Sequence, residues 1–107
     1  MVARLRRVIW SPLALAQIEA IAATIAAERP AAALRWVDGL FEHAARLRQF
    51  PELGVTVPEL GRQEIRELPH PPCRLVYRVD LKHIVVLTVQ HGRQERDFHG
   101  IEGIDAP

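Results

Sequence analysis

The chain of 107 residues has few of the residues on which catalytic and structural sites are most often built. Its only cysteine, Cys73, cannot form an internal disulfide, which excludes a disulfide-framed secreted module. Its only serine, Ser11, precedes a proline, and no glycine-rich phosphate-binding loop is present. The five histidines show no spacing typical of a metal site, so neither a metal ion nor a cofactor is expected.

Long apolar runs are also missing, although 49% of the residues are hydrophobic. No segment approaches the roughly 20 apolar residues of a transmembrane helix, so no membrane association is expected. Arginines precede the apolar stretch at residues 8–16, as in a signal peptide, but Ser11-Pro12 interrupts that stretch and favours a helix start. We therefore expect a cytoplasmic protein with a single domain over residues 1–107, its core at about residues 5–95 and a short tail after it.

Net charge is nearly absent, because 14 basic residues face 13 acidic ones. No global field recruits nucleic acid or anionic lipid, so any such binding must be local. All but one of the basic residues are arginines, and the exception is Lys82. Arginine clamps phosphates and carboxylates through forked hydrogen bonds, but it does not exchange its proton at neutral pH.

Hydrophobic periodicity predicts one strand, two helices and then three strands. Apolar residues at spacings of three and four predict the helices, and Pro30 separates them. Alternation predicts the strand at residues 73–79, and an almost continuous apolar run predicts an inner strand at residues 84–89. The expected ranges are strand 5–10, helix 13–28, helix 31–48, loop 52–61 and strands 63–68, 73–79 and 83–90.

This order predicts a two-layer α+β fold of the βααβββ type, in which a helical hairpin covers one face of an antiparallel sheet. The second helix is expected to bury Leu34, Val37, Leu40, Phe41, Ala44 and Leu47. The other face of the sheet is expected to stay open and to carry Arg66, Arg74 and Arg78. The residues after Gly100 are expected to form an end that fades into disorder.

The arginines on the late strands are the candidate functional residues. Arg66, Arg74, Arg78 and Arg93 fit either an acidic partner or a phosphate, and the alternative is that they only solvate an exposed sheet face. Trp36, off the main apolar stripe, is either part of a binding groove or an edge-packed aromatic. Two further side chains are expected in the core, namely Cys73 and Tyr77.

Several short motifs, in this order and at this spacing, carry a family resemblance. They are Trp10-Ser11-Pro12, Phe50-Pro51-Glu52-Leu53-Gly54, Val57-Pro58-Glu59, Arg66-Glu67-Leu68, Cys73-Arg74-Leu75-Val76-Tyr77-Arg78-Val79 and Val89-Gln90-His91-Gly92-Arg93. Over roughly residues 5 to 95 the chain resembles the RelE/ParE family of toxins from bacterial type II toxin–antitoxin systems. The resemblance implies the same βααβββ fold, a cytoplasmic setting and a cognate antitoxin as partner.

Family members of two kinds leave two activities open. RelE-like members are ribosome-dependent mRNA endoribonucleases, whereas ParE-like members poison DNA gyrase by binding to it. The nuclease reaction needs a proton acceptor, a proton donor and a cation over the phosphate, and arginine supplies only the last. Here the only lysine lies in a predicted turn, and Phe98-His99 stands where the resemblance leads us to expect a tyrosine.

We therefore favour a ParE-like gyrase inhibitor with no catalytic residues, in which Arg66, Arg74, Arg78, Arg93 and Trp36 bind the target or the antitoxin. The alternative is a ribonuclease in which histidines replace the missing acid and base beside a phosphate clamp. Its candidates are His99, His91, Arg93, Arg74 and Arg66, with His70 as a further histidine. A third possibility is a non-toxic member that acts only within an antitoxin-bound repressor complex, where the antitoxin contacts the DNA.

Overall fold

The computed structural model describes residues 5–92 and 96–104. Its elements are β1 (Arg7–Trp10), α1 (Pro12–Glu28), α2 (Pro30–Ala45), the 3-10 turn η1 (Arg46–Arg48), β2 (Val55–Thr56), β3 (Ile65–His70), β4 (Cys73–Val79) and β5 (His83–His91). These bounds agree closely with the predicted helices and strands. In the described part of the chain, no helix is long and apolar enough to cross a membrane.

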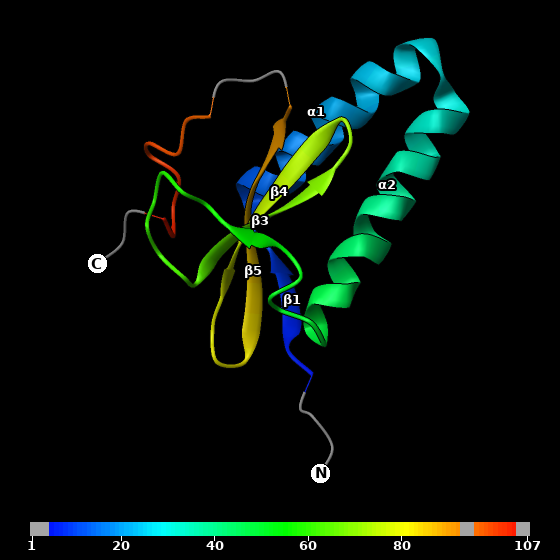
Figure 1. Cartoon of the computed structure of the whole chain (residues 1–107). Helices are drawn as coiled ribbons and strands as arrows, with labels where there is room; N and C mark the ends of the chain where they lie inside the picture. The colour runs from blue at the N-terminus through cyan, green and yellow to red at the C-terminus, as the bar shows by residue number, and fades with distance from the viewer. Residues whose placement is uncertain (1–4, 93–95, 105–107) are drawn as a thin grey trace.

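The strands form one five-stranded sheet in the order β1-β5-β4-β3-β2 (Figure 1). β5 lies inside the sheet, as its apolar run predicts. β1 runs parallel to β5, while the other neighbours are antiparallel, so the sheet is mixed and the prediction of an antiparallel sheet is corrected at this edge. The long connection between β1 and β5 permits this direction, since only a short turn would enforce an antiparallel pair.

The second edge strand, β2, lies in a segment that the sequence predicts as loop. It pairs with β3 through Val55 opposite Glu67 and Thr56 opposite Arg66. Two paired residues are too few to produce a readable alternation, which explains why the sequence pattern does not reveal this strand.

The first helix begins where Ser11-Pro12 predicts it. The Ser11 hydroxyl accepts a hydrogen bond from the Ala14 amide at 3.0 Å, and Pro12 occupies the first helical turn. The same hydroxyl donates to the carbonyl of Leu87 at 2.9 Å, so the helix cap is also a contact to β5. This serine fixes the angle at which α1 leaves β1.

The second helix buries a different stripe from the one expected. Ala33, Trp36, Leu40 and Ala44 are buried, whereas Leu34 is 70% exposed and Phe41 38% exposed. The expected stripe and the observed stripe are adjacent on α2, and both follow the 3.6-residue period. Contact with α1 and the sheet decides which of the two is buried. The expected burial of Leu34 and Phe41 is therefore wrong, and the large aromatic in the core is Trp36.

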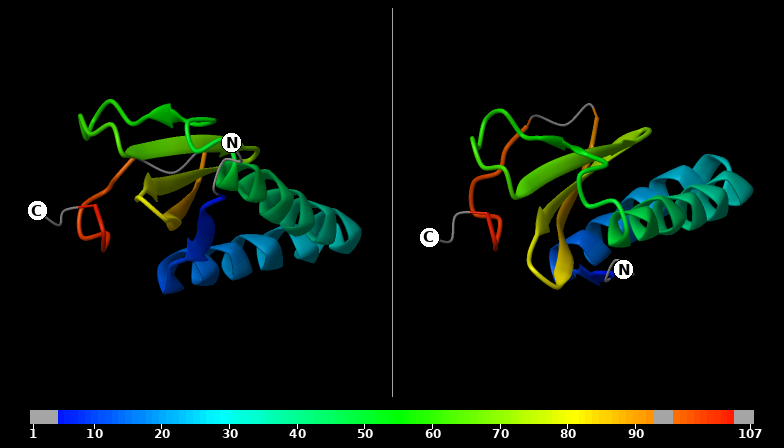
Figure 2. Two further views of the ribbon diagram at one scale, coloured as in Figure 1. Left: turned by 90° about the horizontal axis from the view of Figure 1, so that it is seen from below. Right: turned by 60° about the horizontal axis from the view of Figure 1, so that its bottom comes forward.

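Two hydrophobic clusters pack on the two faces of the sheet. The larger one joins α1 and α2 to the side chains of β3, β4 and β5 that point toward the helices, including Leu75 and Tyr77. Figure 2 shows this helical hairpin along one side of the sheet and the C-terminal segment against another. The smaller cluster contains Val57, Ile65, Val76, Leu87, Phe98, Ile101 and Ile104.

The second face is therefore not open, and the corresponding prediction is wrong. Phe98, Ile101 and Ile104 are nearly inaccessible to solvent and cover the sheet from the C-terminal segment. The packed structure thus extends beyond residue 95, and the segment after Gly100 up to Ile104 is part of it. Burial of apolar surface against Val76 and Leu87 holds this segment in place.

Candidate functional site

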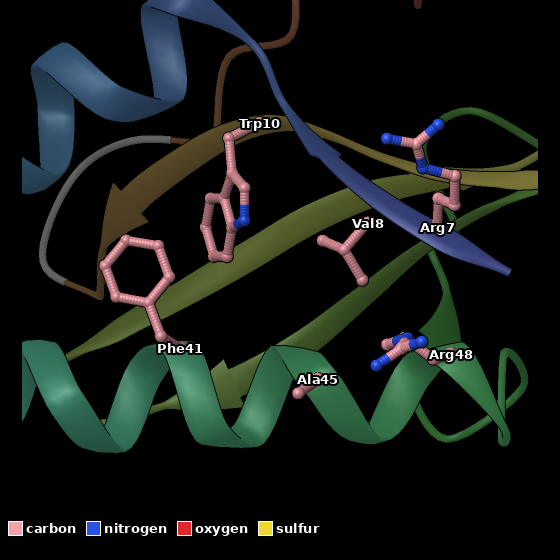
Figure 3. Close-up of a pocket in the computed structure, with 6 residues that line it drawn as sticks. All are labelled: Arg7, Val8, Trp10, Phe41, Ala45 and Arg48. Atoms are coloured by element: carbon pink, nitrogen blue, oxygen red, sulfur yellow. The ribbon is translucent and has the colours of Figure 1, made fainter. Parts of the chain in front are cut away.

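A groove lies between the edge strand β1 and the helix α2 (Figure 3). Its volume is about 310 Å³, and its walls are Arg7, Val8, Trp10, Phe41, Ala45 and Arg48. The rings of Trp10 and Phe41 pack against each other with centroids 4.6 Å apart and planes tilted by 59°. Arg7 and Arg48, both exposed, lie toward the opposite end, so the groove is aromatic at one end and cationic at the other.

The backbone of β1 contributes to this groove because β1 has a sheet neighbour on one side only. The amides of Arg7 and Ser11 donate to the carbonyls of Lys82 and Val86 at 3.0 Å each. Amides alternate in direction along a strand, so those of Val8 and Trp10 point toward the outer edge. The Arg6 amide, which also points outward, donates to the carbonyl of Arg48 at 3.1 Å and so closes one end of the groove.

The predicted arginines do not share one face of the sheet. Arg66 pairs opposite Tyr77 and lies on the helix side, where its Nη1 donates to the carbonyl of Gly54 at 2.9 Å. Arg74 and Arg78 lie on the other face, beside Val76. The expectation that Arg66 shares a face with these two is wrong, because it depended on the register between β3 and β4.

Arg74 and Arg78 are also engaged within the protein. Arg78 holds Asp80 through two hydrogen bonds of 2.9 and 3.0 Å and donates to the carbonyl of Gly103 at 3.1 Å. The hydrogen bonds from Arg78 lower the pKa of Asp80, and the same contact raises the pKa of Arg78. Arg74 donates to the side-chain oxygen of Gln90 at 3.1 Å. These arginines attach the C-terminal segment and the end of the sheet rather than projecting freely.

The candidate histidines are dispersed. His91 ends β5 and is half-buried, while His99 is exposed on the C-terminal segment, where its amide donates to Asp97 at 2.9 Å. His70 lies on the helix side of β3, with its Nδ1 3.3 Å from that of His43. Arg93 lies outside the described residues.

Trp36 packs in the main core and is 8% exposed. Its carbonyl lies 3.4 Å from Nε2 of His70, and its ring lies 6.1 Å from the His70 ring. Burial, with proximity to His70 and Arg46, lowers the pKa of His43. His70 therefore contacts both the core aromatic Trp36 and His43.

Cys73 is buried as predicted, and burial raises the pKa of its thiol to about 11. A thiol with this pKa is almost entirely protonated at neutral pH and is a poor nucleophile. In the parts of the chain that the structure describes, no group of three His, Cys, Asp or Glu side chains is placed to hold a metal ion.

Arg96 is an important charged residue that is not among the candidate site residues chosen from the sequence. Its guanidinium forms ion pairs with both Glu59 and Glu67, and it lies 5.5 Å from the centre of the Phe98 ring. These contacts raise the pKa of Arg96, while the hydrogen bond from Arg96 lowers the pKa of Glu59. The residue thereby joins the C-terminal segment to the long loop and to β3. The sequence signal for a packed segment here is the spacing of the apolar residues that follow Arg96, namely Phe98, Ile101 and Ile104.

A family model matches residues 8–96, and its description is the ParE toxin of the type II toxin–antitoxin system, parDE. The chain belongs to the ParE toxin family. The match covers β2 to β5, both helices and most of β1, so every wall of the β1–α2 groove except Arg7 lies within the ParE region.

Solved structures share the ParE fold. One is the chromosomal ParDE toxin–antitoxin system from P. aeruginosa, with a TM-score of 0.69, 24% identity, and coverage of 83% of this chain and 98% of that one. Another is the RelBE2 toxin–antitoxin complex from Mycobacterium tuberculosis, with a TM-score of 0.54, 20% identity, and coverage of 81% and 98%. No curated protein sequence gives a significant match.

Proposed function

We propose that this ParE-family chain inhibits DNA gyrase by binding to it and that a cognate antitoxin neutralises it. The observation that carries the proposal is the family match over residues 8–96. Both structural neighbours are toxin–antitoxin systems, which supports an antitoxin as partner. The buried, unpaired Cys73 is compatible with action in the reducing cytoplasm.

The placement of the arginines supports binding rather than RNA cleavage. A nuclease site needs its cation and its proton-transfer groups around one phosphate. Arg66 and Arg74 lie on opposite faces of the sheet, so they cannot clamp the same phosphate. Arg78 is committed to Asp80 and Gly103.

The β1–α2 groove is the surface that we propose for the antitoxin. An edge strand with outward amides accepts a further strand, and the adjoining aromatic pair of Trp10 and Phe41 accepts an apolar side chain. Arg7 and Arg48 at the other end favour acidic residues in the bound segment. The sequence pointed to arginines on the late strands as antitoxin contacts. We now propose the β1–α2 groove in place of most of them.

The function is tested with gyrase supercoiling and with ribosome-dependent mRNA cleavage on the purified chain. We expect inhibition of supercoiling with accumulation of cleaved DNA, at micromolar toxin. Lack of inhibition together with cleavage of mRNA would instead establish a ribonuclease. Absence of both, with no growth arrest on expression, would indicate a member that works only inside a repressor complex.

The groove is tested with the double variant Phe41→Ala and Arg48→Gln against the antitoxin encoded beside the toxin. We expect at least a tenfold weaker complex by calorimetry, because an aromatic anchor and a charged contact are lost together. Leu34→Ala is the matched control, since Leu34 is exposed on the same helix but lies outside the groove. An equal loss in both variants would contradict this placement.

A further inference from the structure

A second cleft, of about 300 Å³, lies where β1 begins and where β4 turns into β5. Its walls are Leu5, Arg6, Arg7, Leu81, Lys82 and His83, and no carboxylate side chain is among them. We call the part of this cleft formed by the cationic side chains of Arg6, Arg7 and Lys82, with His83 beside them, the basic end. In Figure 1 the beginning of β1 and the turn before β5 lie together, far from the turn that joins α1 to α2.

The parallel register between β1 and β5 creates the basic end. Arg7 lies directly opposite His83, and the Arg7 amide donates to the carbonyl of Lys82 at 3.0 Å. Nε of Arg6 donates to the carbonyl of Asp80 at 3.0 Å, which holds its guanidinium beside the turn. Cations more than 70 positions apart in the sequence are thus brought to one edge of the sheet.

Arg7 and Lys82 form no ion pair among the described residues, while Arg6 also lines a neighbouring cleft that contains Glu52 and Glu64. Asp80 precedes the turn, but its carboxylate is occupied by Arg78 through two hydrogen bonds. A chain with a net charge of only +1 therefore carries a local concentration of cations.

An exposed leucine lies beside these cations. Leu81 is 87% exposed at the tip of the turn and is followed directly by Lys82. Apolar side chains flanked by cations contact the grooves of duplex DNA, where the cations hold the phosphates and the apolar group meets the base edges or base steps.

We propose that the basic end binds the sugar–phosphate backbone of duplex DNA, with Arg7 and Lys82 on phosphates and Leu81 toward a groove. The choice of DNA rests on the proposed function, because gyrase holds duplex DNA at its own active site. The toxin then contacts the enzyme and the DNA held by it at the same time. Most of the attraction is electrostatic and independent of base sequence.

Binding is measured by fluorescence anisotropy of a labelled 20-base-pair duplex with the complete chain, at pH 7.5 and 50 to 200 mM NaCl. Two phosphate contacts, from Arg7 and Lys82, give a slope of log K against log salt of about −1.8, hence about 12-fold weaker binding over this range. Arg7→Gln with Lys82→Gln removes both contacts and is expected to remove most of the salt dependence. Arg29→Gln with Arg35→Gln removes the same charge from exposed sites at the far helical turn and is expected to keep the original slope.

The proposal is overturned if the duplex does not bind at 50 mM NaCl, or if both double variants lose the same affinity. It is also overturned if poly-glutamate displaces the protein as effectively as unlabelled duplex, since the basic end then serves an acidic protein segment. Thermal unfolding of each variant verifies that it is folded. Gyrase inhibition without duplex binding refutes this inference and leaves the proposed function standing, whereas duplex binding without gyrase inhibition does the reverse.

Discussion

Replacing Tyr77 with Phe removes a single oxygen atom from the centre of the protein. The Tyr77 side chain is fully buried, its hydroxyl donates to the carbonyl of Pro51 at 2.7 Å, and it accepts from the amide of Gly54 at 2.9 Å. These two hydrogen bonds fasten the segment between α2 and β2 to β4. The substitution keeps the ring and its packing, so it tests the hydrogen bonds alone.

The loss of stability follows from the two backbone groups that lose their partner, the Gly54 amide and the Pro51 carbonyl. Gly54 is buried, and its unpaired amide costs about 1–3 kcal/mol. Pro51 is only half-buried, so its carbonyl recovers part of its loss by bonding to water. We expect the free energy of unfolding to fall by about 2–3 kcal/mol, which lowers Tm by about 10 °C or more in a domain of this size.

Urea denaturation followed by circular dichroism measures this change directly. A loss smaller than about 0.5 kcal/mol would refute the reasoning, because the two hydrogen bonds would then contribute no more than their exchange with water. An unchanged slope against urea is required as a control, since a changed slope would indicate an altered denatured state.

The pH dependence gives an independent reading of the same residue. Burial raises the pKa of Tyr77 above its usual value of 10, so the folded state keeps the proton that the unfolded state loses first. The stabilisation is complete below pH 10 and is lost as the pH rises from there through the folded-state pKa. Because Tyr77 is the only tyrosine, the gap in stability between wild type and variant should shrink above pH 10, and phenolate absorbance reports this residue alone.

Three further predictions concern Gly54, Cys73 and His43. Gly54→Ala should destabilise the fold by about 1–3 kcal/mol in urea denaturation, because the added Cβ would lie 2.5 Å from the carbonyl oxygen of Glu67; wild-type stability would contradict this. Cys73 should resist iodoacetamide at pH 7.5 until the chain is unfolded, since its thiol is buried with a pKa of about 11. Mass spectrometry measures the labelling, and rapid labelling of the folded protein would contradict this prediction. The lowered pKa of His43 predicts stability that is present above pH 6.5 and lost as the pH falls through the folded-state pKa. His43→Gln should reduce this loss in denaturation series at pH 5 and 7.5, and equal losses in both proteins would contradict this assignment.

Local sequence signals were sufficient for both helices and for every described strand except β2, which was predicted as loop. Ser11-Pro12 predicts the start of α1, because a hydroxyl cap and a proline both belong at that position, and the Ser11–Ala14 hydrogen bond confirms it. Alternation over residues 73–79 predicts β4 with its correct bounds. The apolar run at 84–89 places β5 inside the sheet.

Local sequence patterns did not predict how the elements pair and pack against one another. Arg66 and Arg74 each alternate correctly within their own strands, but only the pairing of Arg66 with Tyr77 decides that they face opposite sides. The spacing of Phe98, Ile101 and Ile104 fits no regular strand, so periodicity does not predict their burial. They are buried because they cover an apolar face of the sheet. The groove beside β1 likewise depends on which strand becomes the edge.

The pairing of β1 with β5 also governs when the protein is able to fold during its synthesis. β1 is synthesised before the other strands of the sheet, but its neighbour among the described strands begins at His83. Until that strand is made, the helical hairpin lacks the inner strand that it covers, and part of its apolar face stays exposed to chaperones or to self-association. Both the groove and the basic end require this pairing, so a nascent chain presents these surfaces only after β5 has been made.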